Sequence, residues 1–83
     1  MNGLKYIVNV SGKKQRDLAK ELGVTEANLS TLINSRQIIP NKYLPRLAEI
    51  FNIQTYYFRK ILTPQDKLTM AIEYFRNNYG IEA

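Results

Sequence analysis

The stretch at residues 15–34 constrains the fold of this chain more than any other part. Apolar residues recur at helical spacing on both sides of a single glycine: Leu18, Leu22, Val24, Leu29 and Leu32. Two helices that cross closely need a small residue at the crossing, which Ala19 provides. The turn between them needs a residue that tolerates positive φ, which Gly23 provides. The spacing therefore predicts two short amphipathic helices around a tight turn, a helix-turn-helix.

The second helix of this pair, about residues 25–34, keeps a polar outer face. Its outward residues are Thr25, Glu26, Ala27, Asn28, Ser30, Thr31 and Asn34. A short helix with such a face suits insertion into the major groove of DNA, where base edges offer hydrogen-bond donors and acceptors. We expect this segment to contact duplex DNA.

The excess of positive charge supports a polyanionic partner. Twelve Lys and Arg against seven Asp and Glu give a net charge of +5. Cations lie before and after the outward helix, where DNA phosphates would run: Lys13, Lys14, Arg16, Arg36, Lys42 and Arg46. A solvated basic surface is the alternative interpretation. We favour the nucleic-acid interpretation because the cations flank the helix on both sides.

Composition argues against several other classes of function. The 83 residues suffice for one domain and include no cysteine and no histidine. Imidazole bases and His-based metal sites are thus excluded, and the carboxylates show no pairing, so we expect no enzyme, no metal and no cofactor. No stretch approaches the roughly 20 apolar residues of a membrane span, and no signal peptide opens the chain. A reducing cytoplasm is the natural setting.

Helical spacing extends to both sides of the pair. A first helix has an apolar stripe of Leu4, Ile7 and Val8. Asn2 is its expected N-cap and Ser11-Gly12 its stop, although apolar and polar residues also alternate over 5–10, as in a strand. We favour a helix because the stripe gives the helix-turn-helix a packing partner.

The next boundaries follow from caps and turn residues. The first helix of the pair is expected at about 14–22. The second should start after the N-cap Thr25 and end near Asn34 in the left-handed conformation, and a loop should follow at 36–40. A fourth helix should carry Pro45 in its first turn and stop at Asn52, with an apolar face of Leu44, Leu47, Ala48 and Phe51. Ile53 should turn back onto the core.

Two further helices are expected in the last third of the chain. A short one over 55–62 should bury Phe58 and Ile61 or Leu62, leaving at least one of Tyr56 and Tyr57 for a partner. A longer one starts with Thr63 as N-cap, Pro64 in the first turn and Asp66 three residues after the cap, and it stops at Gly80. Along one side it carries Leu68, Ala71, Ile72, Phe75 and Tyr79.

The series over residues 2–62 resembles the lambda-repressor/Cro type of helix-turn-helix domain, the Xre-like group of bacterial and phage repressors. The matching residues are Gln15, Leu18-Ala19, Gly23-Val24, Leu29, Leu32, Pro40, Tyr43-Leu44-Pro45 and Leu47-Ala48. The resemblance implies an all-α fold. It consists of a five-helix DNA-binding bundle at 1–62 and one additional C-terminal helix within an extension at 63–83.

Two departures from the family pattern are informative. Where many members have a buried Arg–Glu ion pair, this chain has Val8 and Ile33, and we expect these two side chains to touch. Lys13 and Lys14 stand where a Leu and a Thr or Ser cap are commoner. The first helix of the pair could therefore begin earlier, capped by Ser11.

The resemblance implies which residues read bases. In the family these are the start of the recognition helix and one turn further, here Glu26, Ala27 and Thr31, with Asn28 and Ser30 beside them. Glu26 can accept from cytosine N4, Asn28 can pair with adenine, and Ala27 and Thr31 can touch a thymine methyl. The alternatives are stabilisation of the helix dipole by Glu26, capping by Asn28 and a plain surface role for Thr31.

Phosphate contacts need flexible cations and donors at helix starts. The best candidates are Gln15, Arg36, Lys42 and the hydroxyl of Tyr43. Lys13, Lys14 and Asn34 come next.

The additional helix suggests an oligomer. Its candidate dimerisation residues are Leu68, Ile72, Phe75 and Tyr79. The alternative is that this helix folds back and covers its own core. We favour a dimer because one half-site rarely gives useful specificity.

Together these features predict a cytoplasmic, nucleoid-associated transcriptional regulator that binds double-stranded DNA. We expect a repressor that binds a palindromic operator as a homodimer, with recognition helices about 34 Å apart, one turn of duplex. Two rivals remain: an antitoxin with autoregulatory DNA binding, and a protein-interaction module that has lost DNA binding. A toxin or an antirepressor is a possible protein partner. If these residues are the whole protein, induction by self-cleavage is not expected, because the second domain of self-cleaving phage repressors is absent.

Overall fold

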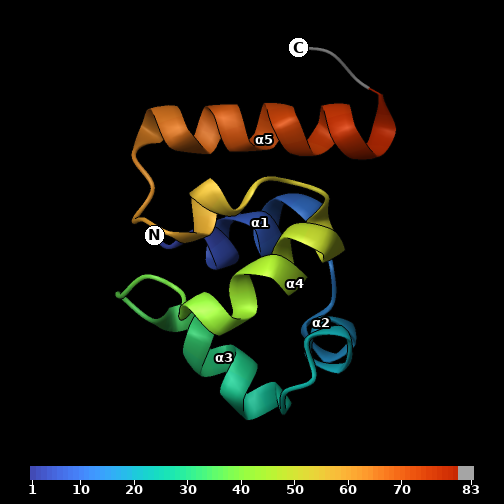
Figure 1. Cartoon of the computed structure of the whole chain (residues 1–83), viewed down its shortest axis with the longest axis vertical. Coiled ribbons are helices and arrows are strands. Elements are labelled where there is room, and N and C mark those ends of the chain that lie inside the picture. The colour runs from blue at the N-terminus through green and yellow to red at the C-terminus, as the bar shows by residue number, and fades with distance from the viewer. Residues whose placement is uncertain (81–83) are drawn as a thin grey trace.

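The computed structural model describes residues 1–80, which form five α-helices and two short 3-10 turns. In chain order they are α1 (Gly3–Ser11), α2 (Gln15–Leu22), α3 (Glu26–Asn34), η1 (Asn41–Tyr43), α4 (Leu44–Phe51), η2 (Thr55–Phe58) and α5 (Pro64–Tyr79) (Figure 1). The all-α class predicted from the sequence is confirmed. No helix within this described part is long and apolar enough to cross a membrane.

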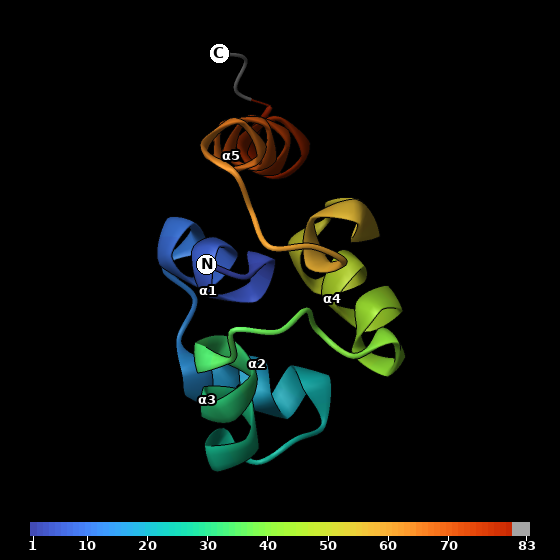
Figure 2. The same ribbon diagram turned by 90° about the vertical axis from the view of Figure 1, so that its left-hand side faces the viewer.

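The elements stack along the longest axis of the molecule, which measures 35 Å. Figures 1 and 2 show α5 at one end and α3 at the other, with α1 and α4 between them. The helix-turn-helix of α2 and α3 therefore lies at the end remote from the C-terminal helix.

One apolar core joins all five α-helices. Its most deeply buried side chains are Leu4, Ile7, Leu18, Leu29, Ile39, Leu47, Phe51, Phe58 and Met70. Ala19 is buried, as the crossing of α2 and α3 requires, and Gly23 has a φ of 78° in the turn. Gly3 lets α1 approach η2 closely, because a Cβ at this position would collide with the carbonyl oxygen of Tyr57.

The predicted caps account for most of the helix boundaries. The side chains of Asn2, Thr25 and Thr63 accept hydrogen bonds at the starts of α1, α3 and α5. Gly12, Gly23, Asn52 and Gly80 end their helices in the left-handed conformation. The strand alternative for residues 5–10 is wrong, because α1 covers them.

Three local predictions are corrected by the structure. α2 starts at Gln15 without a side-chain cap, and Ser11 instead ends α1. Asn34 is not left-handed, since Asn52 is the one non-glycine residue with positive φ in the described chain. The expected helix over 55–62 is only the 3-10 turn η2.

Tertiary hydrogen bonds explain why the 3-10 turn η2 does not continue as a helix to residue 62. The amide of Leu62 donates to the carbonyl oxygen of Met1 at 3.0 Å, and Asn2 and Ile61 form an isolated antiparallel bridge. Extended backbone at 61–62 is required for this pairing, and Pro64 further disfavours helix at the residue before it. Leu62 is buried and Ile61 is exposed, so of the two alternatives Leu62 joins the core.

Asn2 connects α1 to the end of α3. Its Oδ1 accepts from the amide of Lys5 at 2.8 Å. Its Nδ2 donates to the carbonyl oxygens of Leu32 at 2.9 Å and Ser35 at 3.0 Å, and more weakly to that of Ile33 at 3.4 Å. The buried side-chain amide of Asn2 thus provides hydrogen-bond partners for the start of α1 and for the end of α3.

Val8 and Ile33, which stand where the family has its ion pair, lie on α1 and near the end of α3. Ile33 is buried, and Val8 is half-buried and packs against the same core. Direct contact between the two side chains remains a prediction.

α5 folds back onto the domain, the alternative considered for this helix. Its inner face buries Asp66, Met70 and Tyr74. Of the stripe predicted from the sequence, Leu68 is 56% exposed and Tyr79 is 61% exposed, whereas Ala71, Ile72 and Phe75 are half-buried and Phe75 packs against the core.

Polar side chains fasten α5 to the end of α4. Asn52 and Asn77 each donate from the side-chain amide to the other's carbonyl oxygen, at 3.1 and 2.9 Å. Asn78 donates to the carbonyl of Phe51 at 2.8 Å. The carboxylate of Glu73 accepts from the backbone and the side chain of Gln54, at 2.8 and 2.7 Å. These bonds satisfy carbonyls at the end of α4 and fix the direction of α5.

The start of α5 is held by a capping box and an ion pair. Thr63 Oγ1 accepts from the amide of Asp66 at 3.1 Å, and Asp66 Oδ2 accepts from the amide of Thr63 at 3.0 Å. Lys60 Nζ lies 2.9 Å from Asp66 Oδ2. The bond from Lys60, followed by that from Thr63, lowers the pKa of Asp66 from 3.8 to about 2.

We predict that replacing Asn2 destabilises the domain through both ends of its side chain. Asn2→Ala should lower the free energy of unfolding by about 2–4 kcal/mol, the sum of a lost N-cap and unsatisfied buried carbonyls. Asn2→Asp keeps the acceptor for Lys5 but turns a carboxylate toward carbonyl oxygens, so it should be no more stable than the alanine variant. Urea unfolding followed by circular dichroism measures this, with Asn9→Ala, exposed on α1, as control. Wild-type stability of Asn2→Asp would contradict the role of the donor.

We also predict a specific pH dependence for Asp66. Because its pKa is lower in the folded state, its ionisation stabilises the fold above pH 3.8, and this contribution is lost as the pH falls toward about 2. Asp66→Asn should be less stable than wild type at neutral pH, and the difference should vanish near pH 2. The free energy of unfolding measured against pH tests this, and Asp17→Asn, which removes an exposed carboxylate, is the control. A constant difference at all pH values would count against the ion pair.

Candidate nucleic-acid interface

The outer face of α3 is open along its length. Five of the predicted contact residues on it are exposed: Glu26, Ala27, Asn28, Thr31 and Asn34. Ser30 is half-buried, so it is the least accessible of the predicted base-reading positions. In Figure 2, α3 lies at the lower end of the molecule and neither α5 nor α4 covers it. The face is therefore accessible to a rod-shaped partner.

The inner face of α3 fixes its orientation. Leu29 and Ile33 are buried, with exposed fractions of 0% and 5%. Thr25 Oγ1 accepts from the amide of Asn28 at 3.1 Å and closes the first turn. The start of α3, which carries Glu26 and Ala27, is therefore held in helical geometry before any partner binds.

Two polar side chains on the outer face bond to their own helix. Thr31 Oγ1 donates to the carbonyl of Ala27 at 3.1 Å. Asn34 Nδ2 donates to the carbonyl of Ser30 at 2.9 Å. Because the hydroxyl proton of Thr31 is used internally, its methyl group and its lone pairs are what it offers to a base.

The N-terminus of α2 offers donors for an anion. Lys14 is its N-cap residue and makes no side-chain cap bond, so backbone amides of the first turn have no side-chain acceptor. Lys14, Gln15 and Arg16 are exposed around it. Lys13 differs, because its Nζ lies 2.7 Å from the carboxylate of Glu21. Of the predicted phosphate contacts here, Lys14 and Gln15 are more available than Lys13.

The second group of predicted phosphate contacts follows α3. Arg36 and Lys42 are exposed, and Lys42 Nζ lies 5.1 Å from the centre of the Tyr43 ring. Tyr43 packs partly against the core, so the ring beside Lys42 is fixed. The cations lie on both flanks of α3 in the sequence, as expected.

Sequence reasoning missed the structural role of Arg46. Its Nε donates to the carbonyl of Glu21 at the end of α2, at 3.0 Å, and its Nη1 lies 3.2 Å from Glu49. Arg46 therefore joins α4 to α2 and is less available to phosphate than its position in the sequence suggested. No local sequence signal marks this contact, because it joins residues on two different helices.

Residues 1–80 contain no group of three or more His, Cys, Asp or Glu side chains that could hold a metal ion. The chemistry available at this surface is hydrogen bonding, charge and apolar contact. These are the interactions with which proteins bind nucleic acid.

Comparison with known proteins agrees with this geometry. A family model described as helix-turn-helix, of the Cro/C1 type, matches residues 4–58, from the first turn of α1 to the end of η2. No curated protein and no solved structure matches the chain. The matched part contains the core, the turn and the recognition helix in the expected order. The chain belongs to the lambda-repressor/Cro-like, Xre-type helix-turn-helix family of DNA-binding regulators.

Proposed function

We propose that this protein is a transcriptional repressor that inserts α3 into the major groove of a specific operator. The observation that carries the proposal is the exposed polar face of α3 at the free end of the molecule, opposite α5 (Figure 1). The first turn of α3 is closed by Thr25 and its inner face is locked in the core. A preorganised helix of this kind loses little conformational entropy on binding.

Four exposed residues would read bases. Glu26 accepts from cytosine N4, and Asn28 pairs with adenine in a bidentate manner. Ala27 and the methyl group of Thr31 contact thymine methyl groups, which agrees with the internal bond of the Thr31 hydroxyl. Ser30, which is half-buried, contributes at the edge of this contact.

Phosphates would be held on both sides of the groove. The uncapped amides of α2, with Gln15 and Lys14, would bind phosphates of one DNA strand. Phosphates of the other strand would be bound by Arg36, Lys42 and the hydroxyl of Tyr43. Asn34 and Lys13 make weaker contributions, because each already has a partner within the chain.

Repression follows from occupancy of the operator. A protein bound over a promoter excludes RNA polymerase, which needs neither catalysis nor a cofactor. Such a repressor works in the cytoplasm, associated with the nucleoid when bound.

We further propose that the protein binds DNA as a homodimer through the outer stripe of α5. The stripe consists of Leu68, Ile72, Phe75 and Tyr79, spaced by four, three and four residues. This is the spacing of apolar seams between packed helices. Aromatic rings supply much of its surface, with Phe75 and Tyr79 6.0 Å apart between ring centres. A two-fold interface would bring the same stripe of two copies together.

The location of the stripe has a consequence for the operator. Because Met70 and Tyr74 face the domain, the exposed residues of the stripe, Leu68 and Tyr79, face away from it, at the end opposite α3. Phe75 is half-buried and also packs against the core. Two copies joined there would lie end to end, and each copy is 35 Å long. Because the polar face of α3 points away from α5, the two recognition helices would face in opposite directions, so they could not both lie on one straight stretch of duplex. The single-turn spacing of about 34 Å expected from the sequence would need another interface.

The same stripe supports a second candidate function. An antitoxin would cover its toxin with an exposed apolar helix face and would use α3 to regulate its own operon. Co-purification of a second small protein encoded beside this chain would favour the antitoxin. A pure protein-interaction module is the remaining rival, and the absence of DNA binding would favour it.

We predict that two substitutions separate phosphate contact from base reading. Arg36→Ala should weaken binding to every duplex by about tenfold and reduce the salt slope by about one unit, because one phosphate contact is lost. Thr31→Ala should mainly relax preference at one position of the site. Gel-shift titrations at several salt concentrations measure both effects.

The matched control for the arginine variant is Arg76→Ala, which removes the same charge from an exposed position on α5. It should retain wild-type affinity. Equal and salt-insensitive behaviour of Arg36→Ala and Thr31→Ala would contradict specific recognition of DNA by α3.

We predict that a charge in the α5 stripe dissociates the dimer without unfolding the domain. Leu68 is 56% exposed, so Leu68→Glu should leave the circular dichroism spectrum unchanged and convert a dimer into a monomer in sedimentation analysis. Asn9→Glu adds the same charge to an exposed position on α1 and should remain dimeric. A monomeric wild type at the same concentrations would overturn the interface.

A further inference from the structure

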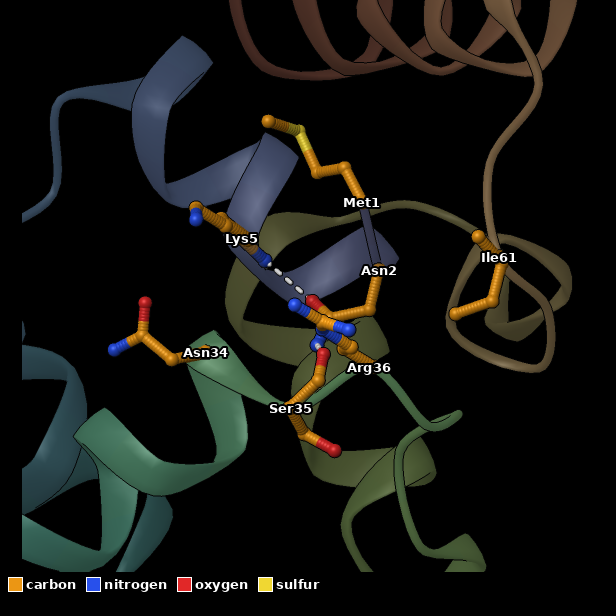
Figure 3. A pocket seen from close by; sticks show the side chains of 7 residues that line it. All are labelled: Met1, Asn2, Lys5, Asn34, Ser35, Arg36 and Ile61. Carbon is orange, nitrogen blue, oxygen red and sulfur yellow. Dashed lines mark hydrogen bonds between the residues drawn. The ribbon is translucent and has the colours of Figure 1, made fainter.

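We infer that a cavity beside the end of α3 binds a small organic anion that combines a phosphate or carboxylate group with an apolar part. The cavity measures about 620 Å³ and lies between the start of α1, the turn after α3 and residue 61 (Figure 3). Its lining residues are Met1, Asn2, Lys5, Asn34, Ser35, Arg36 and Ile61. This volume is within the range of small-molecule sites, about 300–1,000 Å³.

The charge of the cavity selects an anion. Lys5 on α1 and Arg36 after α3 come from different elements and line the same space. No carboxylate among residues 1–80 lines it, and within that range neither cation forms an ion pair. Two cations without an internal counter-charge lower the energy of a bound phosphate or carboxylate.

Hydrogen bonds from Asn2 reduce the negative potential of the carbonyl groups at the end of α3. Asn2 Nδ2 donates to the carbonyls of Leu32 and Ser35, so their oxygens are already engaged where the cavity begins. The hydroxyl of Ser35 accepts from the amide of Gln37 at 3.0 Å, which leaves its proton for a ligand oxygen. The polar part of the lining is therefore donor-rich.

The opposite part of the cavity is apolar. Met1 and Ile61 line it and are 44% and 43% exposed. In the view of Figure 3, Ile61 and Asn34 lie on opposite sides with Arg36 between them. A ligand with an apolar group would cover Met1 and Ile61 while its anionic group meets the cations.

Binding at this cavity would regulate the protein. Arg36 is also a proposed DNA phosphate contact, so a ligand that engages it competes with the operator; this regulatory step rests on the proposed function, whereas the binding itself does not. Asn2 and Ser35 line the cavity and hold the end of α3. An anion here would act as an inducer that lowers affinity for DNA.

The test of binding needs no DNA. Phenyl phosphate, inorganic phosphate and benzyl alcohol are titrated into the ¹⁵N-labelled protein, and amide chemical shifts are followed by NMR. We expect saturable shifts confined to the residues around the cavity with phenyl phosphate, weaker shifts with inorganic phosphate, and none with benzyl alcohol. Shifts that spread over the whole basic surface without saturation would overturn the proposal.

Charge variants test the two cations. Lys5→Gln and Arg36→Gln should each weaken phenyl phosphate binding by about tenfold, the effect of one charge-assisted hydrogen bond. Lys20→Gln removes an equal charge from an exposed position on α2 and should leave binding unchanged. Equal affinity in all three variants would contradict the assignment of Lys5 and Arg36.

Phosphate from the DNA backbone has the same chemistry as the small ligand, so a second arm separates the two sources. If the cavity takes a small anion, phenyl phosphate should displace bound duplex from wild type but much less from Lys5→Gln. If Lys5→Gln weakens DNA binding while phenyl phosphate does not bind, the cavity binds a phosphate of the DNA backbone and the small-ligand proposal is wrong. Saturable binding by a protein that shows no DNA affinity would refute the proposed function and leave the ligand site intact.

Discussion

The side-chain amide of Asn2 is the interaction on which the arrangement of this domain depends. It caps α1 through one atom and satisfies the end of α3 through the other, while its backbone pairs with Ile61 ahead of α5. The recognition helix is thus fixed at its start by Thr25, along its inner face by the core, and at its end by a residue some thirty positions away. A helix held at three points presents its outer residues in one geometry, which base recognition requires.

The α3 end and the α5 end of the molecule differ in surface chemistry, so we assign them different binding partners. One end carries the polar face of α3 with cations beside it, and the other carries the apolar stripe of α5. Between them the Asn52–Asn77 and Gln54–Glu73 bonds join α5 to α4 rigidly. A partner bound to α5 would therefore lie at a defined distance and direction from α3.

Much of this fold could be predicted from local sequence. Caps, proline and left-handed residues act within one turn, so Asn2, Thr25, Asn52 and Thr63 marked the helix boundaries. The exposed face of α3 could be predicted as well, because Leu29 and Leu32 were expected on its inner side; Leu29 is buried and Leu32 is half-buried against the core, where Ile33 is the second buried residue. The predicted helix over 55–62 failed because distant backbone groups at residues 1 and 2 pair with 61 and 62.

The orientation of α5 could not be predicted, because the helix is apolar on two sides. Met70 and Tyr74 lie about half a turn from the stripe of Leu68, Ile72, Phe75 and Tyr79, and periodicity alone does not say which side packs. The ion pair of Asp66 with the half-buried Lys60 and the hydrogen bonds of Asn77 and Asn78 decide it. Similarly, Arg46 was grouped with the free cations because its bond to Glu21 is a tertiary contact.

Selection of bound sequences from a pool of random duplexes tests the central claim most directly. If the outer face of α3 reads bases, the enriched duplexes should share a motif, and Thr31→Ala should alter that motif at a single position while Arg36→Ala leaves it unchanged. Enrichment of no motif by folded wild-type protein, with affinity for all duplexes alike, would contradict the claim that α3 recognises DNA sequence.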